Sequence, residues 1–230
     1  MRPIFAALAF AGFFMTTEAV AQDAPVVIEL YTSQGCSSCP PADAMLHDLA
    51  KYDDVIALAL HVDYWDYIGW ADIFADPAYT ARQHAYARAA RATTVYTPQM
   101  VINGQDRVVG SRPMQVMDLV QAHRAKGTPI AVSLARNGNR VRITAAPGHR
   151  GDYVVQLVRY TPEETVLIGR GENAGREVSY ANIVNSWTVL SRWDGTTALA
   201  LDADASGSDP VVVIIQQIRS GPIVGAAQLR

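Results

Sequence analysis

Cys36 and Cys39 are the only cysteines in this 230-residue chain, and two serines separate them. The apolar run Val26–Tyr31 precedes the pair, and the helix-like stretch Pro41–Tyr52 follows it. Both thiols therefore lie at the start of a predicted helix, where unpaired N–H groups and the helix dipole favour the thiolate over the thiol. A two-residue spacer permits a disulfide, so the pair can cycle between dithiol and disulfide. We expect Cys36, the more exposed thiol, to attack a substrate and Cys39 to resolve the mixed disulfide.

The composition is that of a globular protein, with 50% hydrophobic and 18% charged residues. This is enough for one large domain or two small ones. The net charge of -3 is mild and argues against nucleic acid as the main partner.

The first residues have the pattern of a signal peptide. Ile4–Met15 is apolar but too short to cross a bilayer, and Ala19-Val20-Ala21 matches an A-x-A cleavage site. We expect residues 1–21 to be removed by cleavage near Ala21, which leaves no stable membrane anchor. Export would place the mature chain in an oxidising compartment, either the periplasm or the medium outside the cell.

Up to residue 128 the mature chain alternates strand-like and helix-like segments. Val55–Val62 is apolar throughout, as in a central strand. Asp76-Pro77 predicts a helix start, with Asp as the N-cap and Pro at the first helical position. Asn103-Gly104 predicts a hairpin between two strands, Ser111 would cap a last helix, and Gly127 would end it. The predicted order over residues 22–128 is β, α, β, α, β, β, α.

After residue 128 the chain consists of short strand-like runs between turn residues. Asn137-Gly138 predicts a hairpin between the first two runs, and no helical periodicity lasts long enough to compete. The predicted strands are Ala131–Ala135, Arg140–Ala146, Tyr153–Tyr160, Thr165–Gly169, Val184–Leu190, Thr197–Leu201, Val211–Arg219 and Ile223–Leu229. We therefore predict an α/β domain over residues 22–128, followed by an all-β sandwich-like domain over residues 129–230.

The N-terminal order, with C-x-x-C between the first strand and the first helix, resembles the thioredoxin fold. The resemblance implies a cis-proline loop that faces the cysteines, and Thr97-Pro98 lies where this loop belongs. It implies that Pro98 is cis and that Thr97 offers backbone groups to a bound peptide or mixed disulfide. It also implies a buried acid on the first strand behind Cys39. Glu29 is the candidate, because burial would raise its pKa and suit it to proton transfer. The alternative is that Glu29 caps the edge of the sheet or pairs with an arginine.

Longer segments resemble a more specific family. Glu29–Asp43, His61–Asp66 and Tyr96–Gly104 are similar to a secreted bacterial family, domain-of-unknown-function family 1223, which is thioredoxin-like in fold. Gly171–Arg176 and the ending around Gly221-Pro222-Ile223 add to the resemblance, which covers nearly all of the mature chain. It implies the fold and the exported location more strongly than it implies a reaction.

The leading hypothesis is an exported thiol–disulfide oxidoreductase or redox partner that acts on protein or small thiol and disulfide substrates and needs no cofactor. One alternative is a copper or zinc carrier. His61 ends the second strand, close in such a fold to the cysteine loop, and with Cys36 and Cys39 it would form a soft N/S ligand set. The other alternative is a non-catalytic binding module with a structural disulfide.

Two further features concern access to the cysteines. Tyr64, Trp65, Tyr67 and Trp70 cluster after the second strand and could either pack in a core or form the wall of a groove beside the thiols. The polar, glycine-rich loop Gly171–Arg176 lies between predicted strands, as functional loops on rigid scaffolds often do. We expect the β-rich domain to pack against the α/β domain and to narrow access to Cys36.

Overall fold

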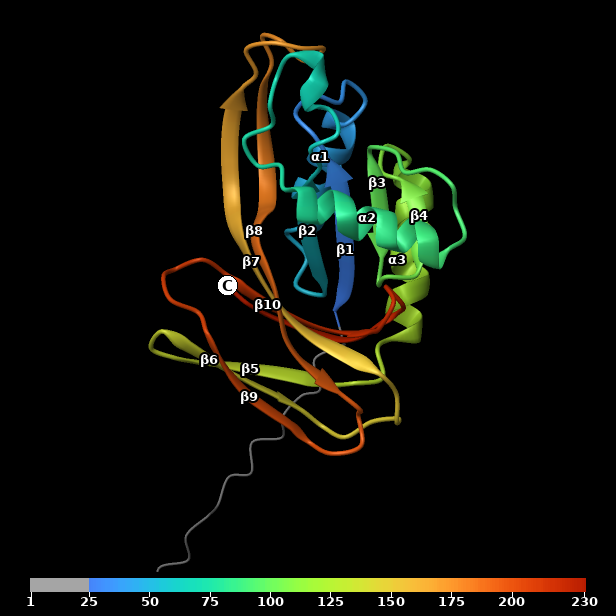
Figure 1. Ribbon diagram of the computed structural model, residues 1–230, viewed down its shortest axis with the longest axis vertical. Coiled ribbons are helices and arrows are strands. Elements are labelled where there is room, and N and C mark those ends of the chain that lie inside the picture. Colours follow the sequence, from blue (N-terminus) through green and yellow to red (C-terminus); the bar gives the residue numbers. More distant parts are fainter. Residues whose placement is uncertain (1–24) are drawn as a thin grey trace, which may run out of the picture.

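The computed structural model describes residues 25–230 (Figure 1). The predicted signal peptide and its cleavage site near Ala21 lie outside the described residues. Within residues 25–230, no helix is both long enough and apolar enough to cross a membrane.

The first half of the chain follows the predicted order β, α, β, α, β, β, α. Asp76 caps the second helix as predicted, because its carboxylate accepts the N–H of Ala78 at 2.7 Å. The prediction for Ser111 is wrong, since Arg112 holds the N-cap position of the last helix, while Gly127 ends that helix with a φ of 65°. The elements are β1 (Val26–Thr32), α1 (Pro40–Leu49), β2 (Val55–His61), the 3-10 helix η1 (Asp66–Ile68), α2 (Pro77–Ala89), β3 (Gln99–Ile102), β4 (Asp106–Val109) and α3 (Pro113–Lys126).

From residue 129 onward the described chain contains strands and no helix. The runs predicted as separate strands at Tyr153–Tyr160 and Thr165–Gly169 belong to one strand, and the strand predicted at Val184–Leu190 extends further at both ends. These two long strands form an antiparallel hairpin. The strands are β5 (Val132–Asn137), β6 (Arg140–Ala145), β7 (Tyr153–Leu167), β8 (Glu177–Trp193), β9 (Leu199–Asp204), β10 (Val211–Gln217) and β11 (Ile223–Leu229).

A single eight-stranded sheet runs through both halves of the chain, in the order β11-β10-β7-β8-β2-β1-β3-β4. The halves join where β8 lies parallel to β2, with Ile183 opposite Ala59. Beside this pair, Asn182 adopts a left-handed backbone conformation and donates from Nδ2 to the carbonyl oxygen of Ala57 at 2.8 Å. The predicted boundary near residue 128 therefore separates two kinds of secondary structure, but the sheet continues across it.

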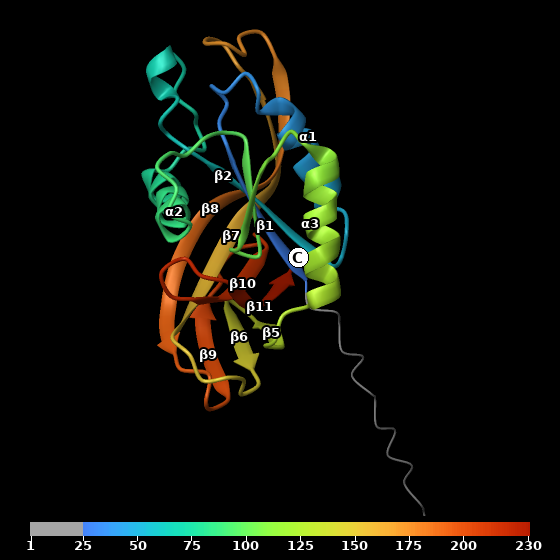
Figure 2. The same cartoon turned by 90° about the vertical axis from the view of Figure 1, so that its right-hand side faces the viewer.

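Side chains alternate along β1 and are buried on both faces of the sheet. Ile28 and Leu30 pack with α1 and α3 in one core, whereas Val27 and Tyr31 pack with α2 in another. Figure 2 shows α3 on one side of the strands and α2 on the other. Glu29 is in phase with Val27 and Tyr31, so its side chain points to the α2 face.

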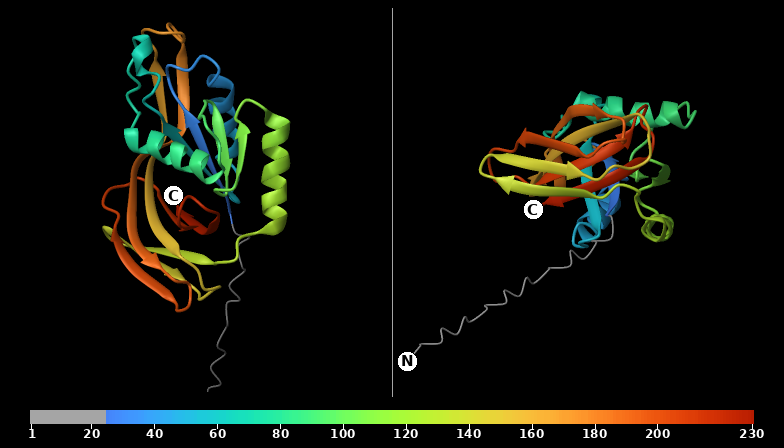
Figure 3. Two further views of the ribbon diagram at one scale, coloured as in Figure 1. Left: turned by 45° about the vertical axis from the view of Figure 1, so that its right-hand side comes forward. Right: turned by 90° about the horizontal axis from the view of Figure 1, so that it is seen from below.

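A second, three-stranded sheet, β5-β6-β9, packs against the part of the large sheet that contains β7 and β10 (Figure 3). Ile143 of β6 packs there with Val211 and Val213 of β10. The intervening residues Val212 and Ile214 face the core beside α2. Because β10 is apolar on both faces, it contributes to both cores and fixes the β-rich half against the first half.

Candidate functional site

Cys36 and Cys39 form a disulfide at the start of α1. Cys39 holds the N-cap position, and Pro40 follows in the first turn, where a missing N–H removes no helical hydrogen bond. The N–H of Cys39 donates to the carbonyl oxygen of Cys36 at 3.1 Å, which makes the turn between them tight. Ser38 Oγ lies 3.4 Å from Cys36 Sγ, so this hydroxyl can donate to a Cys36 thiolate.

Both cysteines are enclosed. Cys36 and Cys39 each expose 0% of their surface, whereas Ser37 and Ser38 between them are exposed. The prediction that Cys36 is the more exposed residue is therefore wrong for the disulfide form. The reason is tertiary: loops from other parts of the chain close around a turn that would be open at an isolated helix N-terminus.

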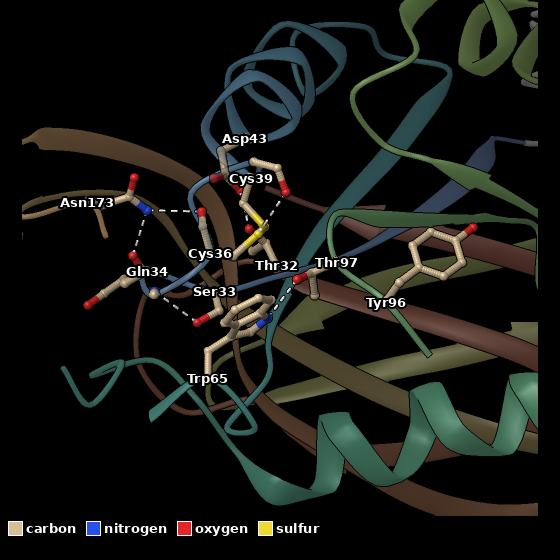
Figure 4. Close-up of a disulfide and its surroundings, with 12 residues drawn as sticks. Thr32, Ser33, Gln34, Cys36, Cys39, Asp43, Trp65, Tyr96, Thr97 and Asn173 are labelled. Carbon is tan, nitrogen blue, oxygen red and sulfur yellow. Dashed lines mark hydrogen bonds between the residues drawn. A yellow bond between two sulfur atoms is a disulfide. The ribbon is translucent and has the colours of Figure 1, made fainter. Parts of the chain in front are cut away.

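Asp43 lies one helical turn after Cys39 on the same face of α1, because residues four apart in a helix are neighbours. Its side chain is buried, and Oδ1 accepts a hydrogen bond from Thr32 Oγ1 at 2.7 Å, while Oδ2 has no hydrogen-bond partner. Burial raises the pKa of Asp43 to about 7, although Thr32 and His61 act to lower it. Figure 4 shows the Asp43 and Thr32 side chains beside the disulfide. Asp43 can therefore gain or lose a proton near neutral pH next to Cys39.

A buried histidine–aspartate pair acts electrostatically on Asp43. His61, the last residue of β2, is fully buried, and its Nδ1 lies 2.7 Å from Asp72 Oδ2. Burial opposes ionisation of Asp72, but His61 and the N–H groups of Gln34 and Phe74 outweigh it and keep the pKa of Asp72 below its usual range. His61 acts to lower the pKa of Asp43, and Asp72 acts to raise it.

The Thr97–Pro98 peptide bond is cis, as the thioredoxin resemblance implies. The loop lies near the start of α1, since a Cβ built on Gly110 would be 3.0 Å from the Ala42 Cβ and 3.3 Å from the Pro98 Cβ. Trp65 connects this loop to the cysteine turn. Its Nε1 donates to Thr97 Oγ1 at 2.8 Å, and Figure 4 shows the indole reaching from the cysteine side toward Thr97.

The tip of the β7–β8 hairpin, residues 168–176, contacts the cysteine turn directly. Asn173 donates from Nδ2 to the carbonyl oxygens of Gln34 at 2.9 Å and Cys36 at 3.0 Å, and its side chain is buried. The tip also packs on Trp70, since a Cβ built on Gly169 would lie only 3.0 Å from the Trp70 ring. Trp70 in turn contacts the cysteine turn, because its Nε1 donates to Gln34 Oε1 at 2.7 Å. The β-rich half thus contributes to the enclosure of the disulfide, as we expected.

Glu29 is fully buried but lies with α2, on the other face of β1 from the α1 core. Arg82 donates to its carboxylate from Nε at 2.7 Å and from a terminal nitrogen at 2.8 Å. The hydroxyls of Tyr86 and Tyr31 donate to the same carboxylate at 2.7 Å and 3.0 Å. This arrangement is the alternative considered for Glu29, an arginine ion pair, and it does not place the carboxylate behind Cys39.

Comparison with known proteins gives the family. A family model described as "Protein of unknown function (DUF1223)" matches residues 27–216. The chain belongs to the DUF1223 family. This DUF1223 chain is 34% identical to a protein from Agrobacterium tumefaciens of known crystal structure, with 91% of this chain and 96% of that chain covered and a TM-score of 0.79.

The DUF1223 chain is also similar to HBP35 of Porphyromonas gingivalis, a second solved structure. The identity is 14%, the match covers 90% of this chain and 75% of that chain, and the TM-score is 0.62, so the likeness concerns the fold alone. No curated protein matches the chain.

The metal-carrier alternative depends on His61 and both cysteines. In the structure the two sulfur atoms are bonded to each other, and His61 Nδ1 contacts Asp72. Within residues 25–230, no group of three or more His, Cys, Asp and Glu side chains is arranged to hold a metal ion. Both sulfur atoms and His61 Nδ1 are therefore engaged in other contacts in the disulfide form, whereas His61 Nε2 is buried without a hydrogen-bond partner.

Three residues around the disulfide had no predicted role: Asp43, Asp72 and Asn173. A local signal was present for Asp43, because Cys39 and Asp43 are four residues apart in a predicted helix and share a face. Asp72 carries no such signal, and for Asn173 the signal was its place in the glycine-rich loop Gly171–Arg176. They are 33 and 134 residues from Cys39 along the chain, counting 72 − 39 and 173 − 39, and only the folded loops bring them to the cysteine turn.

Proposed function

We propose that this DUF1223 protein is an exported thiol–disulfide oxidoreductase, or the redox partner of one, with a thioredoxin-like arrangement of its first half. The observation that supports this most is the combination at one place of a Cys36–Cys39 disulfide, the N-terminus of α1 and an incompletely paired acid, Asp43. A disulfide with only a stabilising role has no need of an adjacent carboxyl group with a pKa of about 7. The cis-Pro98 loop beside the pair supports the same proposal.

In the proposed reaction a substrate thiolate attacks Cys36 Sγ, and the bond between the two protein sulfurs breaks. Cys39 leaves as a thiolate and takes a proton from the carboxyl group of Asp43. A second substrate thiolate then attacks the substrate sulfur of the mixed disulfide, and Cys36 leaves as a thiolate that the helix N-terminus and Ser38 stabilise. The substrate dithiol becomes a disulfide and releases two protons to solvent, one of which is regained by Asp43, and the protein disulfide becomes a Cys36 thiolate and a Cys39 thiol. The reverse sequence reduces a substrate disulfide.

Asp43 takes the proton-transfer role in this proposal instead of Glu29. Glu29 is ion-paired with Arg82 on the α2 face, so it has no free oxygen directed at the cysteines. Asp43 shares a helix face with Cys39 and has a free Oδ2. General acid–base assistance is most effective when the pKa of the group lies near the working pH.

Cysteine variants test the proposed roles. In the reduced protein Cys36 should be alkylated faster than Cys39, Cys36→Ser should abolish exchange with thiols, and Cys39→Ser should accumulate mixed disulfides. Peptide mapping after timed alkylation measures the two alkylation rates. Mass spectrometry of the intact protein measures thiol exchange and the mixed disulfides. If the disulfide is reduced only at the rate of global unfolding, the structural-disulfide alternative is correct.

The pH profile tests Asp43. The rate of disulfide reduction by dithiothreitol, corrected for the thiolate fraction of the reagent, should fall as the pH rises through about 7, because ionised Asp43 has no proton to donate. Asp43→Asn should be slower by roughly 100-fold at pH 6, the lower end of the range for general acid catalysis, and should lack the inflection. A wild-type profile without an inflection would remove Asp43 from the mechanism and leave the cysteine roles standing.

A further inference from the structure

The enclosure of the disulfide raises the question of what a substrate must displace. Thiol exchange requires the attacking sulfur to reach a disulfide sulfur, yet Cys36 and Cys39 expose none of their surface. Some neighbouring group must therefore move before Cys36 can react. The Asn173 side chain holds the cysteine turn through backbone carbonyl oxygens, while Trp65 extends from the same turn to Thr97.

Trp65 is held at two places. Its backbone packs against the turn before Cys36, since a Cβ built on Gly35 would lie 3.1 Å from the Trp65 Cβ and 3.4 Å from its carbonyl oxygen. Its indole makes one hydrogen bond, from Nε1 to Thr97 Oγ1 at 2.8 Å. In Figure 4 the indole lies between the cysteine turn and Thr97. A single side-chain hydrogen bond therefore links the two segments that flank the disulfide.

The segment that carries Trp65 is anchored on both sides of it. Before Trp65, the Thr80 hydroxyl donates to Asp63 Oδ1 at 2.6 Å. Trp70 donates to Gln34 Oε1 at 2.7 Å, and Asp72 accepts the N–H of Gln34 at 2.7 Å. Between these anchors and Trp65 lies η1, which ends at Gly69 in the left-handed conformation with a φ of 94°. The Trp65 indole, held by one hydrogen bond, can thus leave Thr97 while the backbone on both sides of it stays in place.

One exposed aromatic side chain, Tyr67, stacks on Trp65, and another, Tyr96, precedes the hydrogen-bond partner of the indole in the sequence. The Tyr67 ring stacks on Trp65 with centroids 6.5 Å apart and planes at 14°, and Tyr67 is 81% exposed. Tyr96 precedes Thr97 and is 37% exposed. Aromatic side chains that are already exposed offer apolar area to a bound chain at a low cost in conformational entropy. A small thiol such as glutathione has no apolar group to use this area.

We propose that Trp65 determines specificity by closing the disulfide to small thiols, and that the substrate is a polypeptide dithiol with an apolar side chain beside its cysteine. This inference rests on the proposed function. The apolar side chain packs against Tyr67 and Tyr96, the indole leaves Thr97, and the substrate thiolate reaches Cys36 Sγ. The exchange then follows the balanced steps given above. Loss of the indole hydrogen bond alone should favour opening by about 2- to 10-fold, the range that one net hydrogen bond corresponds to.

The test measures reduction of the wild-type disulfide by two reagents at equal thiolate concentration. One is glutathione, and the other is a reduced decapeptide with two cysteines and a phenylalanine beside the first; a matched peptide carries serine in place of phenylalanine. We expect the phenylalanine peptide to react at least about 10-fold faster than the serine peptide. Partial burial of one aromatic side chain in the transition state would give a ratio of this size. Equal rates for the two peptides would overturn the proposal.

Three variants separate the hydrogen bond from the ring. Trp65→Phe and Thr97→Val each remove the bond and should raise the glutathione rate by about 2- to 10-fold, whereas Trp65→Ala should raise it more. Tyr67→Ala should slow the phenylalanine peptide more than the serine peptide, because only the phenylalanine side chain uses the Tyr67 ring. Tyr52→Ala is the matched control, because Tyr52 is an exposed tyrosine beyond the far end of α1.

Conservative variants keep the test decisive if Trp65→Ala fails to fold. Unchanged glutathione rates in folded Trp65→Phe and Thr97→Val would show that the indole does not limit access and would overturn the proposal. If the wild type and all folded variants fail to exchange with either reagent, the proposed function itself has failed. If the wild type exchanges with both reagents equally well, only the gating role of Trp65 has failed.

Discussion

Two buried acids, Glu29 on β1 and Asp43 on α1, differ in how completely they are paired. Glu29 is bound by Arg82 at both carboxylate oxygens and by two tyrosine hydroxyls. Asp43 has one hydrogen bond, to Thr32, and a second oxygen without a partner. Both side chains are buried, and burial raises the pKa of Asp43 to about 7.

The difference shows that burial by itself does not make an acid reactive. A buried carboxylate that is fully hydrogen-bonded to a guanidinium is held in one charge state. A buried carboxyl that lacks such partners changes its charge near neutral pH. The side of β1 with α2 is therefore organised for stability, whereas the side with α1 carries the group that can take part in proton transfer.

The largest expected effect comes from breaking the Glu29 pair. Arg82→Met should lower the free energy of unfolding by about 3–5 kcal/mol, because it leaves the fully buried Glu29 carboxylate without its counter-charge. Urea unfolding measures the loss. The double variant with Glu29→Gln should regain part of it, since no uncompensated charge remains. A loss below about 1 kcal/mol for Arg82→Met, the value of an exposed pair, would contradict the structural role of this pair.

Asp43→Asn should change how stability depends on pH. The pKa of Asp43 is raised from 3.8 to about 7 in the folded protein, so its contribution is fully present below pH 4 and is lost as the pH rises through 7. The free energy of unfolding should therefore fall by an amount on the order of 4 kcal/mol between pH values below 4 and pH values above 7. Three other titratable groups interact electrostatically with this carboxyl: His61, Asp72 and Tyr180.

Unfolding free energies at pH 4, 5, 6 and 7 for the wild type and Asp43→Asn measure this effect. The wild type should lose stability relative to the variant across this range. A difference between the two proteins that does not vary with pH would show that Asp43 stays in one charge state, as a fully paired acid does.

Asn173→Ala should affect the cysteine turn and leave the Glu29–Arg82 pair on the α2 side of β1 unchanged. It removes the donor to two buried carbonyl oxygens, those of Gln34 and Cys36, and should cost about 1–3 kcal/mol. Reduction by dithiothreitol should also become faster, because the hairpin tip no longer holds the cysteine turn. Glu172→Ala is the control, since Glu172 is exposed on the same tip. Equal behaviour of the two variants would show that Asn173 does not secure the turn.

The smallest effect is expected for an acid that is neither buried nor fully paired. His47 Nε2 lies 3.6 Å from Glu163 Oε1, and the two side chains are 35% and 59% exposed. Glu163→Gln should therefore change the free energy of unfolding by no more than about 0.5 kcal/mol, and less at high salt. A larger change in urea unfolding would mean that exposure is a poor guide to the role of acids in this protein.

The long β7–β8 hairpin shows where interpretation of the sequence falls short. The predicted strands Tyr153–Tyr160 and Thr165–Gly169 are separated by residues 161–164, which include Pro162, and proline cannot donate to a sheet. In the structure β10 pairs with β7 only as far as Arg159. Pro162 therefore lies where one edge of β7 is free, and the strand continues to Leu167. Which edge of a strand is free depends on the neighbouring strand, and no local pattern contains that information.

Local pattern was sufficient for most of the first half. Apolar runs, the Asp76-Pro77 helix start, the Asn103-Gly104 turn and the C-x-x-C pair each depend on residues close together in the sequence, and the order of elements that they predict is the one observed. The sequence by itself therefore determined where the disulfide could form and which elements surround it. Only the tertiary structure decided that the disulfide is enclosed, that Glu29 faces α2, and that Asp43, Trp65 and Asn173 meet the cysteine turn. The physical reason is that burial, strand neighbours and the pKa of an acid arise from groups far apart in the chain, which meet only when both faces of one sheet are packed.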